Sequence, residues 1–339
     1  MKTSLEELAK ARDVLLADGA TGTNLFKAGL ETGYPPELWN VEHANRITTL
    51  YEEFVDAGSD MILTNSFGGT SFRLKLHASE TRVQELNLAA ACLARQAADK
   101  ADRPVLVAGS IGPTGELFSP LGMLTPEVAE AAFTEQAEAL AQGGVDVIWI
   151  ETMSALEEVR AATIAAQKTG LPVMATMTFD TAGRSMMGIK PADYKNFAAE
   201  VGLQGFGANC GIGPAELIDS LSHFDALKQP SFVIAKGNCG IPAYIDGEIH
   251  YHGTPELMAE YALIARDLGA NIIGGCCGTS ADHVQAMRTA LDTTPKGDPP
   301  TAENIANRLG VAWKDLPDAA SSDASEERAR RRRRRPKAR

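Results

Sequence analysis

The sequence has no run of apolar residues long enough to cross a membrane. A membrane-spanning helix needs about 20 mostly apolar residues, and the 339-residue chain holds no such uninterrupted run. The N-terminus, MKTSLEELAKARDVLL, also lacks the basic and then apolar layout of a secretory signal. It predicts instead an amphipathic helix that leads into a strand. We therefore expect a cytoplasmic protein that does not bind a membrane.

Basic residues are scarce outside the C-terminus. Nine of the 32 Lys and Arg residues lie between Arg328 and Arg339, so the rest of the chain has 23 basic against 44 acidic residues. This balance argues against a nucleic-acid surface on the folded body. From Lys314 onward the sequence is polar and cannot bury enough apolar surface to fold. We predict a single folded domain over residues 1–313 and a disordered basic tail over residues 314–339. The arginine run either touches RNA, lipid or an acidic partner, or has no specific role.

Cysteines are few, and their placement is uneven. The chain has five: Cys92, Cys210, Cys239, Cys276 and Cys277. An odd number of cysteines in a chain without an export signal favours reduced thiols or metal ligands over disulfides. Adjacent cysteines rarely bond to each other, because the ring would be strained. The pair in NIIGGCCGTS therefore indicates that both sulfurs serve one shared ligand.

Strands and helices alternate along the chain. Eight short apolar runs, each followed by a turn and a helical stretch, predict parallel βαβ units, and eight such units close a (β/α)8 TIM barrel. The alternative is a doubly wound open sheet, but DGATGTN lacks the spacing of a dinucleotide-binding turn. The predicted strands are Val14 to Asp18, Asp60 to Thr64, Val105 to Ser110, Val145 to Glu151, Pro172 to Phe179, Gly205 to Cys210, Ser231 to Gly237 and Asn271 to Cys276.

Polar residues stand at the C-terminal end of every predicted strand, where a barrel carries its active site. Among them, Cys210, Cys276 and Cys277 are expected to converge. Three sulfur ligands with one open position are typical of a catalytic zinc site; the alternative is that these are small buried residues. Cys239 is a weaker candidate for a fourth ligand, and Cys92 is expected in the core.

Six motifs occur in the order seen in the homocysteine S-methyltransferase family. They are DGATGTNL, DMILTNSFGG, VAGSIGPTG, VIWIETM, GANCGIGP and NIIGGCCGTS, and the resemblance covers about residues 12–295. The chain resembles both bacterial single-domain betaine–homocysteine methyltransferases and the homocysteine-binding barrel of cobalamin-dependent methionine synthase. Members are (β/α)8 barrels that bind zinc through three cysteines. The resemblance thus implies that Cys210, Cys276 and Cys277 are the zinc ligands.

The expected substrate is homocysteine, whose thiol becomes a thiolate on zinc. By resemblance, Asp18 and Glu151 face its ammonium group; the alternative for each is an internal salt bridge or a helix cap. Its carboxylate is expected at the turn after the second strand, where side chains and backbone N–H groups converge. The further candidates for substrate binding are Thr64, Asn65, Ser66, Phe67, Gly68, Asn209 and Asn238.

The methyl donor is the least determined feature. Betaine is the first candidate, because aromatic faces bind quaternary ammonium groups and Trp39 and Phe67 lie on the first two loops. However, animal betaine enzymes of this family carry tyrosines where this chain has Gly68 and Thr152. The alternatives are a separate methylcobalamin protein, with this chain as one subunit of a split methionine synthase, and then S-methylmethionine or S-adenosylmethionine. A zinc or amino-acid sensor without catalysis, and assembly into a homo-oligomer, also remain open.

Overall fold

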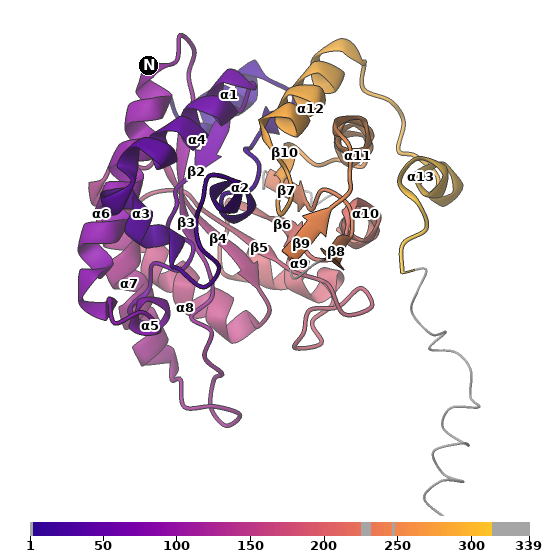
Figure 1. Cartoon of the computed structure of the whole chain (residues 1–339). Helices are drawn as coiled ribbons and strands as arrows, with labels where there is room; N and C mark the ends of the chain where they lie inside the picture. Colours follow the sequence, from indigo (N-terminus) through magenta and orange to yellow (C-terminus); the bar gives the residue numbers. More distant parts are fainter. Residues whose placement is uncertain (1–2, 225–231, 246–247, 314–339) are drawn as a thin grey trace, which may run out of the picture.

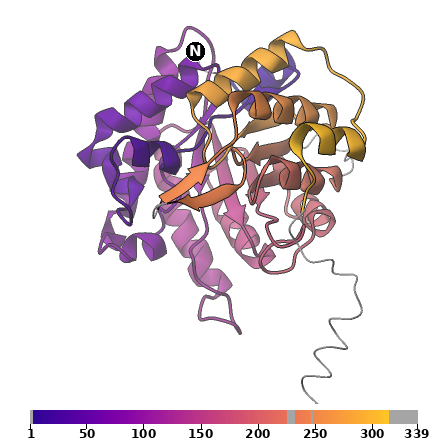
Figure 2. The same ribbon diagram turned by 45° about the vertical axis from the view of Figure 1, so that its right-hand side comes forward.

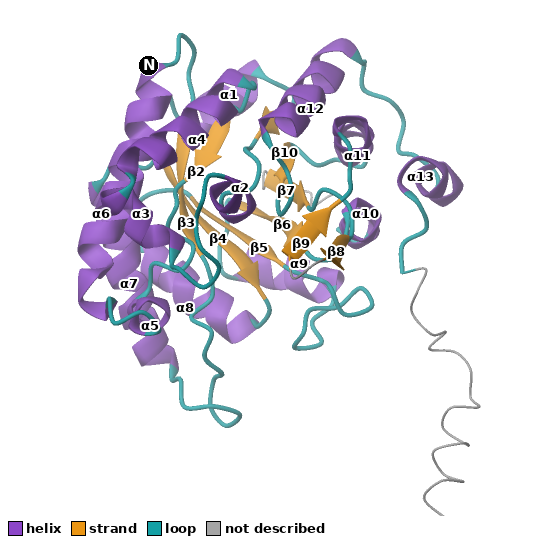
Figure 3. Ribbon diagram, viewed as in Figure 1, coloured by secondary structure: helices purple, strands orange, loops and turns teal. Residues whose placement is uncertain are grey.

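Eight strands form one parallel sheet at the centre of the molecule, with helices on the outside (Figures 1 and 3). The computed structural model describes residues 3–224, 232–245 and 248–313. The prediction of a tail over residues 314–339 lies outside these residues, so the boundary at residue 313 stays a prediction. The strands are β1 (Leu15–Leu16), β2 (Met61–Leu63), β3 (Leu106–Ile111), β4 (Val147–Met153), β5 (Val173–Met177), β6 (Gly205–Cys210), β7 (Phe232–Gly237) and β10 (Ile272–Gly275).

The sheet closes into a barrel. Its strand order is β1-β10-β7-β6-β5-β4-β3-β2. The first and last strands meet through a parallel bridge between Ala17 and Met61, and the Asp60 N–H donates to Leu16 O at 2.7 Å. This closure confirms the predicted (β/α)8 barrel and excludes the open sheet.

The helices begin where the sequence places caps. At α7 and α11, Thr125 and Thr254 each accept a hydrogen bond from a backbone N–H of the first turn, and a proline follows each threonine. None of the helices in the described part is both long and apolar enough to span a membrane. They are α1 (Leu5–Ala11), α2 (Gly22–Lys27), η1 (Pro36–Leu38), α3 (Trp39–Glu42), α4 (Ala44–Asp56), α5 (Ser71–Lys75), η2 (Glu80–Arg82), α6 (Val83–Lys100), α7 (Pro126–Gln142), α8 (Leu156–Gln167), α9 (Pro191–Glu200), α10 (Pro214–Ser222), α11 (Pro255–Asp267), α12 (Ala281–Thr293) and α13 (Ala302–Leu309).

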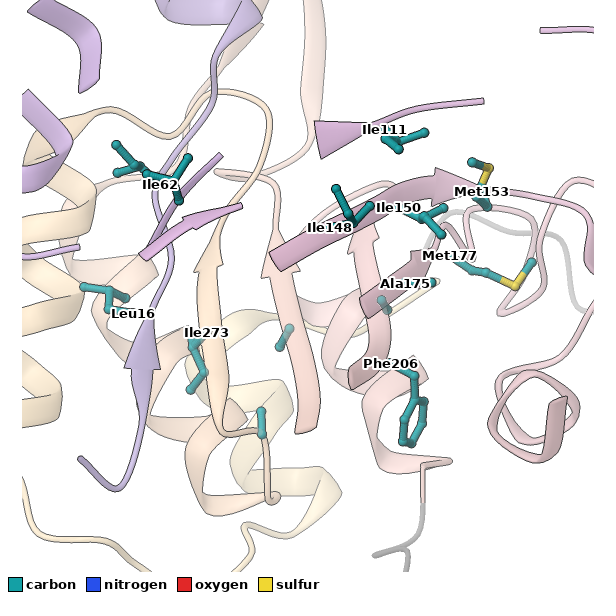
Figure 4. Close-up of a cluster of buried hydrophobic side chains, with 14 of the residues drawn as sticks. Leu16, Ile62, Ile111, Ile148, Ile150, Met153, Ala175, Met177, Phe206 and Ile273 are labelled. Carbon is teal, nitrogen blue, oxygen red and sulfur yellow. The ribbon is translucent and has the colours of Figure 1, made fainter. Parts of the chain in front are cut away.

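Side chains alternate between two cores along each strand, because successive residues point to opposite faces of a sheet. Leu15 and Ile272 belong to the cluster that fills the barrel, whereas Leu16 and Ile273 belong to the cluster between strands and helices (Figure 4). On β7, Ile234 belongs to the inner cluster. Lys236, two residues further along, therefore shares the inward face.

Two features near the mouth differ from the predicted pattern. Strand β4 continues past Glu151 to Met153, with an irregular register between Ile150 and Met153. A hairpin that the sequence analysis did not predict, β8 (Pro242–Ile245) and β9 (Glu248–Tyr251), is inserted between β7 and α11 (Figure 2). Because it follows the C-terminal end of β7, this hairpin belongs to the mouth side of the barrel.

Candidate metal centre and substrate site

The three cysteines predicted as metal ligands converge at the mouth. Cys210 is the last residue of β6, and Cys276 and Cys277 directly follow β10. Their Sγ atoms all lie within 4.8 Å of one another, and those of Cys210 and Cys277 are 3.9 Å apart. All three side chains are partly exposed, so a substrate can reach them.

The spacing of these sulfurs fits a zinc ion. Tetrahedral zinc with Zn–S bonds of about 2.3 Å separates two sulfur ligands by about 3.8 Å. The 3.9 Å between Cys210 and Cys277 meets this value, and the limit of 4.8 Å requires only a small adjustment of Cys276. Three thiolates would hold the metal and leave one position open, which is the arrangement of catalytic zinc.

Asparagines hold the cysteine loops in place. Asn238 donates from Nδ2 to Gly211 O at 2.7 Å and accepts at Oδ1 from the Cys277 N–H at 3.1 Å, so it joins the two loops that carry the ligands. Asn209 accepts from the Thr152 N–H at 2.8 Å and donates to Thr152 Oγ1 at 2.7 Å. Both asparagines, predicted to bind substrate, thus have structural partners.

Backbone strain collects at the same place. Cys210 and Thr152 have φ angles of 61°, a left-handed conformation that is rare for residues other than glycine. The bonds that Asn209 makes to Thr152 support this conformation on β4. Strained backbone persists where surrounding contacts over-determine it, and it is frequent at functional sites.

Cys239 lies outside the three-sulfur cluster. It is buried, its Sγ donates to Gly253 O at 3.1 Å, and it lies 3.0 Å from His283 Nε2. Burial raises the pKa of its thiol to about 11. Its N–H donates to Cys277 O at 2.9 Å. Cys239 therefore supports the ligand loop and the base of the hairpin rather than joining the cluster.

Asp18 lies at the predicted strand end but is paired inside the protein. Its Oδ2 accepts from the Leu63 N–H at 2.7 Å, and its Oδ1 lies 3.2 Å from Lys236 Nζ. Burial raises the pKa of Asp18, and the Lys236 ammonium opposes this shift. Burial also lowers the pKa of Lys236, but Asp18 and its other anionic neighbours more than reverse the effect. The pair is an internal salt bridge, which is the alternative left open for Asp18.

Glu151 has fewer polar partners than Asp18. Its Oε1 accepts from Ser110 Oγ at 2.5 Å, and no partner for its Oε2 is found among the described residues. Burial raises the pKa of Glu151 to about 7. The carboxyl group therefore changes its charge near neutral pH and has an oxygen available for a ligand.

The turn after β2 is largely occupied by its own contacts. The Thr64 and Ser66 hydroxyls are bonded to each other at 2.6 Å, and Ser66 Oγ donates to Ser110 O. Asn65 Nδ2 donates to Pro36 O and Asn40 Oδ1. The Gly68 N–H, predicted to face a carboxylate, donates to Glu37 Oε1 at 2.6 Å. These groups shape the wall of the mouth more than they offer free donors.

The two aromatic residues predicted to bind the methyl donor differ in their exposure. Trp39 is only 4% exposed, and its ring contacts His43 at a centroid distance of 4.8 Å and the Arg46 guanidinium at 4.8 Å. Its face is thus already taken by a cation, which argues against a place in a donor pocket. Phe67 is 36% exposed. Tyr251 of β9 packs against Gly278, and its hydroxyl helps to lower the pKa of the Cys277 thiol.

The three thiols influence one another strongly. Hydrogen bonds from the Cys210 and Cys276 thiols lower the pKa of Cys277 to about 3, and Tyr251 adds to this effect. The bonds to Cys276 and Cys277, together with burial, raise the pKa of Cys210 itself. The hydrogen bonds among the three thiols therefore couple their protonation.

Comparison with known proteins agrees with this geometry. Residues 15–291 match the sequence profile described as homocysteine S-methyltransferase. The chain belongs to the homocysteine S-methyltransferase family. Curated relatives are the methionine synthases of Mycobacterium leprae strain TN, 29% identical over 318 residues and 88% of this chain, and of Mycobacterium tuberculosis strain H37Rv, 30% identical over 297 residues and 82% of this chain. The matches cover 26% and 24% of those proteins, so the chain spans about a quarter of their length.

Solved structures show the same fold. The homocysteine methyltransferase MmuM of Escherichia coli, in its metallated form, is 23% identical, with a TM-score of 0.70 over 84% of this chain and 99% of that one. Its apo form gives a TM-score of 0.66 at 23% identity and covers 84% of this chain and 98% of that one.

Three residues beside the candidate site were missed from the sequence. Lys236 had a readable signal, because it is a charge within the apolar run FVIAKG. Tyr251 lies in an insertion whose position relative to the cysteines depends on the fold. Ser110 was noted only as a strand end, yet its hydroxyl is the partner of Glu151.

Proposed function

We propose that this chain is a zinc-dependent homocysteine S-methyltransferase that forms methionine. The observation that carries the proposal is the convergence of Cys210, Cys276 and Cys277, with all sulfurs within 4.8 Å, at the mouth of a barrel of this family. Zinc bound there would supply the deprotonation of the substrate thiol at neutral pH. Because the three cysteines are partly exposed, the substrate thiol can approach them from solvent.

The mouth suits an amino acid with a thiol. Glu151, with its available oxygen, is the proposed partner of the substrate ammonium. Asp18 is paired with Lys236, so Glu151 is the acid that keeps an oxygen for the substrate. Asn209 and Asn238 keep the cysteine loops and the strained Thr152 in place, so the substrate meets a preformed site.

Transfer would be an in-line displacement. The homocysteine sulfur, having lost its proton to solvent, approaches the methyl carbon from behind at about 3–3.5 Å. The new S–C bond forms while the bond from methyl to the onium nitrogen breaks, and the electron pair leaves with the neutral amine. The acidic mouth attracts a cationic donor and does not hold the neutral product, which favours its release.

Betaine is the proposed donor. A quaternary ammonium group needs aromatic surface, and two exposed or half-exposed rings are available: Phe67 on the turn after β2 and Tyr251 on the hairpin. Tyr251 replaces Trp39 in this role, because Trp39 is buried against Arg46.

A separate methylcobalamin protein is the second candidate donor. Loops that follow β3 and β5 lie on the mouth side and expose large apolar side chains, a surface typical of protein partners. These are Leu117, Leu121, Met123, Met186 and Met187.

A donor screen tests the proposal. The purified chain should contain one zinc per chain by elemental analysis, and methionine formation from homocysteine is followed with betaine, S-methylmethionine, S-adenosylmethionine and a methylcobalamin protein. Methionine from betaine supports the first donor, and methionine only with the methylcobalamin protein supports the second. A chain that binds zinc and homocysteine yet forms methionine with no donor would be a sensor, and the proposal would be wrong.

A further inference from the structure

A lysine lies buried inside the barrel just below the candidate metal centre. Lys236 is 3% exposed. In the sheet it is paired with Asn209 and Gly274, which precede Cys210 and Cys276 by one and two residues. Burying an ammonium group is costly unless it is paired. Such a charge in a barrel interior otherwise filled by apolar side chains calls for a reason.

The known partners of Lys236 do not exhaust its donors. An ammonium group carries three N–H donors. Lys236 Nζ donates to Gly19 O at 3.1 Å and lies 3.2 Å from Asp18 Oδ1. In the part of the chain that the structure describes, no third acceptor is found. The positive charge of Lys236 also interacts with Glu151 and Cys276, so the lysine lies near both the Glu151 carboxyl group and the cysteine cluster.

The turn that was expected to bind the substrate carboxylate has few donors left. Four N–H groups after Thr64 already donate: Asn65 to Tyr51 Oη, Ser66 to Thr64 O, Gly68 to Glu37 Oε1 and Gly69 to Ser66 O. A carboxylate at the mouth also faces Asp18 and Glu151, which repel it. It therefore needs a cation, and Lys236 is the cation that acts on both acids.

We infer that Lys236 binds the carboxylate of the amino-acid substrate, while Glu151 binds its ammonium and Asp18 holds the lysine in place. This inference rests on the proposed function. The site then recognises three groups of one molecule: a thiol at the cysteines, an ammonium at Glu151 and a carboxylate at Lys236. Lys236 is in this view a residue that determines substrate specificity.

Two truncated thiols separate these contacts. 3-Aminopropane-1-thiol lacks the carboxylate of homocysteine, and 4-sulfanylbutanoate lacks its ammonium. Binding of homocysteine and of each analogue to the zinc-loaded full chain is measured by calorimetry for wild type, Lys236→Gln, the charge-neutral double variant Asp18→Asn/Lys236→Met, and Glu151→Gln. The double variant is included because Lys236→Gln leaves Asp18 as an unpaired buried charge, which can prevent folding. Lys100→Met, on the exposed end of α6, is the matched control.

The expected result is selective. Both Lys236 variants should bind homocysteine and 4-sulfanylbutanoate more weakly by roughly 10- to 150-fold, the usual loss for a hydrogen bond to a charged group, and should bind 3-aminopropane-1-thiol as wild type does. Glu151→Gln should show the reverse pattern. If the variants keep the wild-type preference for homocysteine over 3-aminopropane-1-thiol, the role of Lys236 is wrong and the proposed function stands. If wild type itself does not bind homocysteine, both are wrong.

Discussion

The two ends of the barrel bury acidic residues in opposite ways. At the N-terminal end, Asp60 contacts the guanidinium groups of Arg12 and Arg288 at 3.1 Å each, and that of Arg103 at 3.9 Å; it also accepts from the Leu16 N–H. At the mouth, Asp18 and Glu151 share the charge of one lysine. The acid at the bottom is surrounded by cations, whereas the mouth is short of them.

This difference separates a structural site from a ligand site. Asp60 connects the end of α1, the start of β2 and α12. Its carboxylate is already paired with arginines of the protein, so it is not available to a ligand. The mouth, in contrast, keeps an available oxygen on Glu151 and three clustered sulfurs. A metal or substrate binds most favourably where a preformed site offers polar groups that have no partner within the protein.

The largest effect is expected from removing the cysteine pair. The double variant Cys276→Ala/Cys277→Ala should lose its zinc and all methionine formation, because one thiolate cannot hold the ion. Its melting temperature without metal should stay close to that of metal-free wild type. Elemental analysis and thermal melting check this. Zinc retained at one per chain would contradict the ligand assignment, and Cys92→Ala, on α6, is the control.

A substitution at the N-terminal end of the barrel should lower stability and leave zinc binding unchanged. Asp60→Asn leaves the partly exposed guanidinium groups of Arg12 and Arg288 without their anion, and losing a hydrogen bond to a charged group typically costs about 1.5–3 kcal/mol. Denaturant unfolding should show this loss, while the folded fraction binds zinc and homocysteine normally. Asp180→Asn, at a partly exposed position on the loop after β5, is the control. A variant that is stable but binds no zinc would remove the distinction between the two ends.

Glu151 should make ligand binding depend on pH. A carboxyl group with a pKa of about 7 goes from roughly a tenth ionised at pH 6 to nine tenths at pH 8. If its anion binds the substrate ammonium, methionine, whose thioether does not titrate, should bind about tenfold more tightly at pH 8. Calorimetry at both values, with Glu151→Gln as a variant expected to show no such change, checks this. An equal change in methionine affinity between pH 6 and pH 8 for both proteins would contradict the role of Glu151.

The same shift in pKa predicts a pH dependence of stability. Because the folded pKa lies above the ordinary value of 4.5, the folded state favours the protonated form. The contribution to stability is complete below that value and is lost as pH rises through about 7. The free energy of unfolding of wild type should therefore fall as the pH rises from about 4.5 through about 7, relative to that of Glu151→Gln.

A smaller effect is expected at Tyr251. Its hydroxyl favours the thiolate form of Cys277, so Tyr251→Phe removes this stabilisation at a half-exposed site. The apparent zinc affinity should fall about fivefold, which corresponds to a hydrogen bond of about 1 kcal/mol. Competition with a chelator measures this. Tyr34→Phe, which removes a hydroxyl bonded to Glu42 on the surface, is the matched control and should leave the affinity unchanged.

No effect on chemistry is expected from the tail. A chain ending at Asp315 keeps α13 and Trp313, whose indole N–H donates to Asp219 at 2.9 Å on α10. Its activity with purified substrates should equal that of the full chain. A large loss would show that the arginines act in the site or in assembly.

Much of the fold could be predicted, because its signals are local. The alternation of Leu15, Leu16 and Ala17 between two cores follows from the period of a strand, and the caps at Thr125 and Thr254 lie within one helical turn of the groups they bind. The hairpin β8–β9 could not be predicted in this way, since it interrupts the regular order of units.

The barrel and the convergence of the three cysteines follow from local sequence signals. Periodicity and turn residues define the strands, and strands of a parallel barrel all end at one mouth, so Cys210 and Cys276 had to approach each other. Which polar groups at that mouth bind each other depends on the three-dimensional fold. The pairing of Asp18 with Lys236 and the burial of Trp39 against Arg46 join residues from different elements. No local pattern encodes these contacts, because they depend on how the closed barrel sets side chains of distant strands at hydrogen-bonding distance.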